Sequence, residues 1–195
     1  EVTDSIDVST ITEGSVTVNC KKLLQIIKAL GKLSTSNFEL INNELVLTSG
    51  RSTFKLKTTP SEDYPSLDDA QYITELVMPE CDLVDLLKPV SYASATQDAR
   101  YYLNGLYIAN NKGLTVCGTD GHRMAVNSLE SEWQSFEGII IPINSVTEII
   151  KILDPKNDEF ITLKLSDRHL QVVKENPSFT TKLIDGKYPD YNAAI

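Results

Sequence analysis

The sequence has little of several features that mark common classes of protein. Its 195 residues include three cysteines, two histidines and one tryptophan. Cys20, Cys81 and Cys117 lie far apart and no Cys-x-x-Cys pair occurs, so the sequence predicts neither a disulfide framework nor a zinc site. We interpret all three as free thiols in a reducing compartment. There is no apolar run of about eighteen residues and no basic segment before an apolar one near the start, so we expect neither a membrane span nor a signal peptide.

Basic residues are also scarce. The 18 Lys and Arg residues are outnumbered by 27 Asp and Glu residues, which leaves a net charge of -9. Domains that bind nucleic acids are usually basic, so the bulk charge argues against such a partner. That argument loses weight if the positive charge gathers on one face of the protein.

Catalytic motifs are missing as well, because the sequence has no G-x-S-x-G, no H-E-x-x-H and no glycine-rich phosphate loop. Asp120 and His122 form an Asp-x-His pair that would suit acid–base catalysis or metal binding. Neighbouring side chains on a turn point apart, however, and a catalytic zinc needs three protein ligands. The other interpretation is a turn in which these side chains cap backbone groups. We therefore expect a non-catalytic protein with no metal and no cofactor.

What the sequence does contain is an internal repeat. An Ile-Ile-Lys triplet begins at Ile26 and again at Ile149, and the pair Tyr64–Pro65 recurs 124 residues later as Tyr188–Pro189. One unit is therefore about 124 residues long. Duplicated halves also occur in α+β folds for packing reasons alone. The repeat by itself therefore indicates a fold class and not a function.

Each half of the repeat predicts a helix followed by three strands of alternating apolar residues. Amphipathic helices are expected at about 19–32, 79–90 and 146–153. Pro79 suits the start of the second helix, where Glu80, Asp82 and Asp85 would complement the helix dipole. The apolar stripes comprise Leu23, Ile27 and Leu30 on the first helix, Leu83, Leu86, Leu87 and Val90 on the second, and Val146, Ile149, Ile150 and Leu153 on the third.

A short acidic connection at 66–71 separates two units. We expect residues 70–195 to form one complete unit and residues 1–69 to form only the later part of an earlier unit. The incomplete unit should expose a strand edge and one side of its helix. Because exposed edges recruit partners, we expect self-association, or disorder before about Val16.

Residues 100–126, RYYLNGLYIANNKGLTVCGTDGHRMAV, predict three short strands joined by two turns. Leu106 and Ile108 alternate with Tyr107 and Ala109, as in a strand with one buried face. The first turn is the Asn-Asn-Lys-Gly cluster that follows Ala109. The second turn is Thr-Asp-Gly-His, in which Gly121 is free to adopt the left-handed conformation.

The motifs RYYLNG and TDGHRMAV, at this spacing, closely resemble the central domain of the bacterial sliding clamp family, the DNA polymerase III beta subunits. The resemblance implies a DNA-clamp fold of class α+β, with duplicated helix-plus-antiparallel-strand units and helices on one face of a continuous sheet. It assigns 1–69 to the end of the first clamp domain and 70–195 to the second, with the third domain absent. It further implies a cytoplasmic, non-catalytic processivity factor that forms a homodimeric ring around double-stranded DNA. The implied partners are the DNA polymerase III catalytic subunit, the clamp loader and other proteins with a clamp-binding motif.

Basic residues on the first helix are the first candidate site. Lys28 and Lys32 each fall within about 20° of Lys21 around a helix, and all three lie opposite its apolar stripe. Such a line is usually a solvated face. With the resemblance, we favour a face that follows DNA phosphates without reading sequence. The resemblance adds Gln97 and Arg100, in a loop that approaches DNA, although Arg100 could instead pair with Asp98 or with a carbonyl.

A peptide groove is the second candidate site, and it rests on the resemblance. Apolar residues would form its floor, while Arg123 and the turn backbone would hydrogen-bond an extended peptide. Met124 stands where Leu is more usual, Ala193 and Ala194 are smaller than their counterparts, and the third-domain half of the groove is absent. The alternative function is a protein-interaction module of clamp-like fold without a DNA role. The groove residues are Leu103, Thr119, Gly121, His122, Arg123, Met124 and Pro189.

Overall fold

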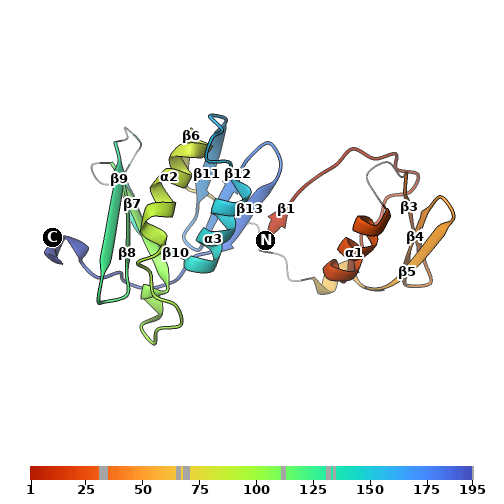
Figure 1. Ribbon diagram of the computed structural model, residues 1–195, viewed down its shortest axis with the longest axis horizontal. Coiled ribbons are helices and arrows are strands. Elements are labelled where there is room, and N and C mark those ends of the chain that lie inside the picture. The colour runs from red at the N-terminus through yellow and green to blue at the C-terminus, as the bar shows by residue number, and fades with distance from the viewer. Residues whose placement is uncertain are drawn as a thin grey trace. The chain divides into compact units, whose positions relative to one another are not determined.

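The computed structural model describes residues 1–30, 35–64, 67, 71–110, 113–130, 133 and 135–194. Two compact units are visible in Figure 1. The larger unit comprises Glu1–Ile6 and Leu67–Ile195, and the smaller unit comprises Asp7–Ser66. Residues 1–6 join the larger unit because β1 (Val2–Thr3) pairs with β13 (Ser178–Lys182) at a sheet edge. None of the helices within the described ranges has the length and apolar character needed to cross a membrane.

The smaller unit combines α1 (Cys20–Leu30) with an antiparallel sheet in the order β2-β5-β4-β3. Asn19 caps the helix, because its side-chain Oδ1 accepts a hydrogen bond of 3.0 Å from the backbone N–H of Lys22. Asn42 and Asn43 both have positive φ angles and make the tight turn between β3 and β4. The strands are β2 (Thr17–Val18), β3 (Asn37–Ile41), β4 (Glu44–Ser49) and β5 (Ser52–Thr59), followed by a 3-10 turn at Ser61–Asp63.

Among its described residues, the larger unit has two helices, α2 (Glu80–Ser91) and α3 (Ile143–Ile152), which contact each other. Its strands form two antiparallel sheets, in the orders β1-β13-β12-β11-β6 and β10-β7-β8-β9. The remaining bounds are β6 (Thr74–Pro79), β7 (Gly105–Asn110), β8 (Leu114–Thr119), β9 (Met124–Leu129), β10 (Phe136–Pro142), β11 (Phe160–Leu165) and β12 (His169–Val173), with 3-10 turns at Tyr101–Leu103 and Tyr191–Ala194.

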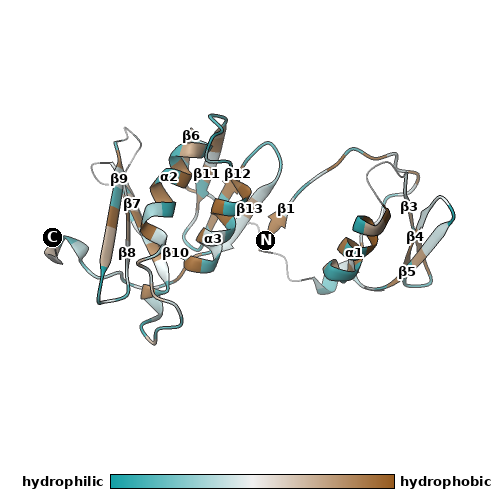
Figure 2. Cartoon of the chain, in the orientation of Figure 1, coloured by the Kyte–Doolittle hydropathy of each residue, from teal (hydrophilic) through white to brown (hydrophobic). Residues whose placement is uncertain are grey.

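One hydrophobic core joins both helices of the larger unit to both of its sheets. Leu87 and Val90 of α2 are 1% exposed, and Val146 and Ile149 of α3 are 0% and 1% exposed. Figure 2 shows apolar residues along both helices. The core therefore contains residues from both helices and from both sheets of this unit.

The duplicated α+β organisation is confirmed. The order α1, β3, β4, β5 in the smaller unit recurs as α3, β11, β12, β13 in the larger unit, and both sets of strands form antiparallel meanders. Within the described residues the strands form three antiparallel sheets.

Two local expectations need correction. On α1 the half-buried residues are Leu23, Ile26 and Leu30, whereas Ile27 is 47% exposed. In β7 the expected outward side is covered, because Ala109 is 2% exposed and Tyr107 stacks on Tyr188.

Glu80 does more than complement the helix dipole, because its side chain is fully buried. One carboxylate oxygen accepts a hydrogen bond of 2.9 Å from the backbone N–H of Asp154. The other accepts one of 3.1 Å from the side chain of Asn157 and lies 2.5 Å from the ammonium group of Lys174. The acidic residue thus ties the start of α2 to the loop that follows α3.

Candidate DNA and peptide interfaces

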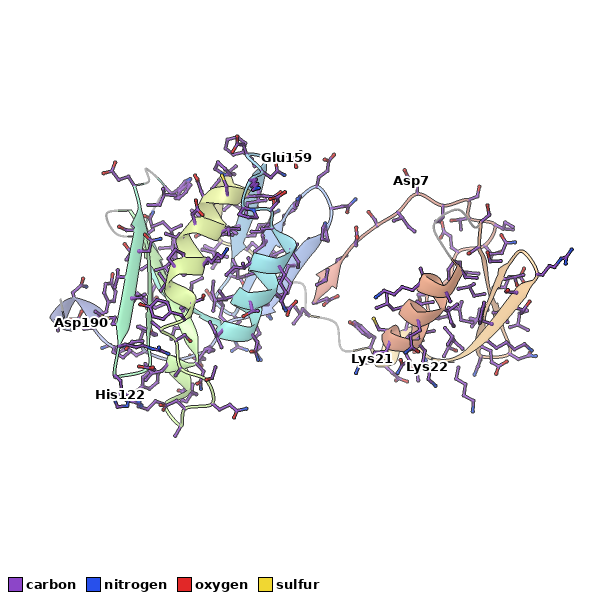
Figure 3. The ribbon with its side chains drawn as sticks, viewed as in Figure 1. Asp7, Lys21, Lys22, His122, Glu159 and Asp190 are labelled. Carbon is purple, nitrogen blue, oxygen red and sulfur yellow. The ribbon has the colours of Figure 1, made fainter. Side chains whose placement is uncertain are left out.

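The lysine line is exposed as far as the structure describes it. Lys21 and Lys28 are both exposed on α1, on the side of the helix away from Leu23 and Leu30. Figure 3 shows Lys21 and Lys22 at the start of this helix. Lys32 lies outside the described residues. The helices of the larger unit offer no comparable line within the described residues, because α2 carries Glu80, Asp82, Asp85 and Lys88 and α3 carries only Glu148 and Lys151.

Gln97 and Arg100 lie in the loop between α2 and β7 of the larger unit. Gln97 is exposed and has a φ angle of 60°, an uncommon left-handed conformation for a residue with a side chain. Arg100 forms a bidentate ion pair with Asp98, with Nε–Oδ1 and Nη2–Oδ2 distances of 3.0 and 2.9 Å. The alternative expected for Arg100, pairing with Asp98, is therefore present in the structure. These two residues and the lysine line belong to different units.

The turn between β8 and β9 is held by its own side chains. The Thr119 hydroxyl accepts a hydrogen bond from the Gly121 N–H at 3.0 Å and donates one to the Arg123 carbonyl at 2.7 Å. Asp120 Oδ1 accepts hydrogen bonds from the backbone N–H groups of His122 and Arg123, at 2.9 and 3.0 Å. These two bonds are the main reason that the pKa of the Asp120 carboxyl is lowered.

This arrangement confirms that Asp120 caps backbone groups, and it changes the expected chemistry of the site. The N–H groups of Gly121, His122 and Arg123 already have partners inside the turn, so they are not the donors that would bind a peptide. No group of three or more metal-binding side chains occurs within the described residues. His122 is exposed at the tip of the turn (Figure 3).

Arg123 remains the candidate donor. Its Nε pairs with Asp120 Oδ2 at 3.1 Å, and its guanidinium carbon lies 5.5 Å from the centre of the Tyr92 ring. These contacts fix the direction of the side chain, which is still 58% exposed. The two terminal nitrogen atoms have no hydrogen-bond partner among the described residues, so they can serve an incoming carbonyl or carboxylate.

Apolar residues from three parts of the chain meet beside this turn. Leu103 and Met124 belong to one small cluster together with Tyr188, which directly precedes Pro189. Leu103 is 2% exposed, whereas Met124 is half-buried and Pro189 is exposed. The structure therefore brings Leu103, Met124 and the Tyr188–Pro189 segment together, with Leu103 underneath and Met124 and Pro189 toward the surface.

The aromatic side of this cluster was missed in the sequence. Tyr107 stacks on Tyr188 with ring centres 5.1 Å apart, and Tyr191 lies 5.9 Å from Tyr107. Burial raises the pKa of the Tyr188 hydroxyl, which donates a hydrogen bond of 3.4 Å to the Cys117 carbonyl. Burial also raises the pKa of the Cys117 thiol to about 11, so this cysteine is an inert core residue. The sequence carries one signal for this residue, because the Tyr-Pro pair that contains Tyr188 recurs in the repeat.

The fold and these surfaces define a class of protein. It is a duplicated α+β chain that exposes lysines on one helix and an apolar surface beside the 119–124 turn. Residues 78–190 match the family described as DNA polymerase III beta subunit, central domain, and residues 1–68 match its N-terminal domain. The chain belongs to the DNA polymerase III beta subunit family.

Individual relatives agree with this assignment. The chain is 36% identical to the beta sliding clamp of Proteus mirabilis over 93% of its length, and 36% identical to that of Haemophilus influenzae over 100%. The crystal structure of the DNA polymerase III subunit beta from Pseudomonas aeruginosa covers the whole chain with a TM-score of 0.94 and 31% identity. The chain spans 50% and 54% of the two curated relatives and 54% of that crystallised chain.

Proposed function

We propose that this chain is part of a replicative sliding clamp, with residues 1–69 in the first clamp domain and 70–195 forming the central one. The complete protein would be a homodimeric ring in the bacterial cytoplasm that encircles double-stranded DNA and does no chemistry. It would raise the effective concentration of the polymerase at the primer end by tethering it. The family membership of both units is the observation that carries this proposal.

The proposed DNA contact rests on the exposed lysines of α1. Lysine ammonium groups bind phosphate oxygens without reading bases, which suits a ring that must slide. Concentrating the positive charge on one helix also reconciles DNA binding with a net charge of -9. The acidic character of α2 makes the smaller unit the main place where this chain would contact DNA.

The DNA contact is tested by reversing the charge of Lys21 and Lys28. We expect the Lys21→Glu, Lys28→Glu variant to bind a short labelled DNA duplex more weakly. Its affinity should also depend less steeply on salt, by about 0.9 in the log–log slope for each phosphate that is no longer neutralised. The control is Lys55→Glu, Lys57→Glu, which makes the same charge change at exposed positions of β5 in the same unit. Equal weakening in both variants would contradict a specific role for α1 and favour the alternative, an interaction module without a DNA role.

The second proposed surface binds extended peptides of DNA polymerase III, the clamp loader and other clamp-binding proteins. Leu103, Met124 and Tyr188 supply an apolar base beside the exposed Pro189, and Arg123 supplies the polar contact. A flexible, polarisable Met suits a surface that accepts several partners. The partner side chains would therefore be apolar, with a polar group facing Arg123.

Fluorescence polarisation with a labelled peptide of the QLxLF type tests this surface. We expect saturable binding that is weakened by both Arg123→Ala and Met124→Ala. Arg51→Ala serves as the control, because Arg51 is an exposed residue of the smaller unit. Binding that survives both changes at the turn would place the peptide elsewhere.

A further inference from the structure

The side chain of Arg100 connects a loop that the family resemblance places near DNA with a turn that the proposed function assigns to peptides. Its Nε and Nη2 atoms pair with Asp98, in the loop proposed to approach DNA. The same Nη2 also donates a hydrogen bond of 3.2 Å to the backbone carbonyl of Asp120, in the turn proposed to bind peptides. One guanidinium group therefore holds the loop and the turn together.

Gly121 leaves room for this guanidinium group because it has no side chain. Its φ angle of +87° is left-handed, and a Cβ atom built on it would lie 3.0 and 3.1 Å from the Nη1 and Nη2 atoms of Arg100. The glycine thus provides both the backbone conformation of the turn and the space in which Arg100 packs. If Arg100 leaves, the turn loses the hydrogen bond to Asp120 and the group that covers Gly121.

Asp98 is held in place to receive Arg100. Its backbone N–H donates a hydrogen bond of 2.9 Å to Asn104 Oδ1, and its carbonyl accepts one of 3.0 Å from Asn104 Nδ2. The Asp98 Oδ1 atom also accepts the backbone N–H of Arg100 at 2.8 Å. The carboxylate is therefore preorganised, and the hydrogen bond from Arg100 lowers the pKa of Asp98 to about 2.

A DNA phosphate would compete for the same donors. The paired donors of a guanidinium match a phosphate as well as they match a carboxylate, and the Arg100 side chain is 48% exposed. A phosphate that takes Nε and Nη2 must displace Asp98, which holds the side chain in place. The Arg100 side chain is then free to move toward the phosphate, and this movement breaks the Nη2 bond to the Asp120 carbonyl. Nothing else among the described hydrogen bonds joins the side chain of Arg100 to the turn.

We propose that Asp98 and Arg100 form a latch that couples the two surfaces: Asp98 keeps Arg100 on the 119–124 turn, and a DNA phosphate that captures Arg100 loosens that turn. This inference rests on the proposed function and assigns Asp98 and Arg100 as positioning residues of the peptide surface. Coupling of this kind is reciprocal, so DNA bound at the loop weakens peptide binding at the turn and peptide weakens DNA binding there.

Asp98→Asn tests the latch, because Asn104 still holds the backbone at position 98. We expect this variant to bind a short labelled DNA duplex about fivefold more tightly and the QLxLF-type peptide about fivefold more weakly. The control is Asp167→Asn, an exposed change in the same unit that alters the net charge equally. A purely structural role for Asp98 would weaken both ligands, and that result would overturn the latch.

Hydrogen exchange tests the latch without any ligand. We expect the backbone amides of Gly121, His122 and Arg123 to exchange faster in Arg100→Ala, with part of the protection restored by Arg100→Lys. Unchanged exchange in Arg100→Ala would overturn the latch whatever the peptide does. If the wild-type chain binds no peptide while these amides lose protection and Asp98→Asn gains DNA affinity, the peptide surface is wrong and the latch on the turn stands.

Discussion

Helices α1 and α3 are equivalent in the repeat, yet they differ in burial. Val146 and Ile149 of α3 are 0% and 1% exposed, whereas α1 has no buried residue. Their counterparts on α1, 123 residues earlier, are Leu23 and Ile26, which are half-buried. The sequence patterns are alike, so the difference lies in the neighbours.

Helix α3 contacts a second helix, α2, and also strands β7 and β10 of the larger unit. In the smaller unit α1 contacts β5, and Leu24 and Ile27 remain 48% and 47% exposed. The expected exposed side of the first helix is thus confirmed, while self-association of the chain stays a prediction. An amphipathic helix supplies an apolar face, but that face stabilises the fold fully only when other elements pack against it.

All ion pairs within the described residues lie in the larger unit. Breaking the buried pair of Glu80 and Lys174 should lower the free energy of unfolding of this unit more than any other change considered below. We expect Glu80→Gln to destabilise the larger unit by about 4 kcal/mol, since it leaves the ammonium of Lys174 without its partner. Denaturation followed by the fluorescence of Trp133, the single tryptophan, reports on this unit.

Glu148→Gln is the matched control for this change. Glu148 and Lys151 form an exposed ion pair with side chains 53% and 62% exposed, so its loss should cost under about 1 kcal/mol. Equal effects of the two substitutions would mean that Glu80 is solvated in solution.

Truncation of the equivalent isoleucines compares the two helices directly. We expect Ile149→Ala to cost about 3 kcal/mol, because it leaves a cavity in a closed core. Ile26→Ala should cost about 1 kcal/mol in the smaller unit, because Ile26 is only half-buried. Urea denaturation monitored by hydrogen exchange separates the units, and an equal cost at Ile26 would show that α1 is covered in solution.

The pH dependence of the larger unit should contain a contribution from Asp98. Its folded-state pKa of about 2 lies below the ordinary value of 3.8, so the carboxylate contributes stability above pH 3.8 that is lost as the pH falls toward 2. The Arg100→Ala substitution should raise the Asp98 pKa back toward 3.8, and carboxyl titration by NMR measures this change. A titration near the ordinary value in the wild type would mean that the ion pair does not persist in solution.

The smallest effect is expected on the exposed side of α1. Ile27→Gln should change the stability of the smaller unit by less than about 0.5 kcal/mol, because the side chain is already largely in water. Ile150→Gln, at the equivalent position of α3, should be more costly because Ile150 packs against the core. Thermal denaturation of both variants checks this, and a marked destabilisation in Ile27→Gln would indicate an occupant on this face.

The turn at 119–124 was predictable in form but not in its contacts. Thr, Asp and Gly at these positions indicate a capped turn, because their side chains and φ angles act on the neighbouring backbone. The ion pair of Arg100 with Asp98 was one of two open alternatives. Its second bond, to the Asp120 carbonyl, depends on how β7, β8 and the 92–104 loop fold together.

Two other features escaped prediction for the same reason. Glu80 and Lys174 lie far apart in the sequence, and no local pattern pairs them. Tyr107 and Tyr188 belong to different halves of the repeat, and only the antiparallel packing stacks their rings. Ile27 was misplaced because Ile26 and Ile27 both fall near the apolar side of a helix, so only the packing neighbours decide between them.

The sequence by itself determined the repeat, the helices and strands, the tight turns and the family, because these depend on local periodicity, on turn chemistry and on motifs in fixed order. The tertiary structure decided which equivalent helix is buried, where Glu80 finds its partners, and that Arg100 joins the loop to the turn. Those outcomes depend on contacts between segments that are distant in the sequence. Burial and ion pairing stabilise the fold only when the folded chain brings both partners into contact.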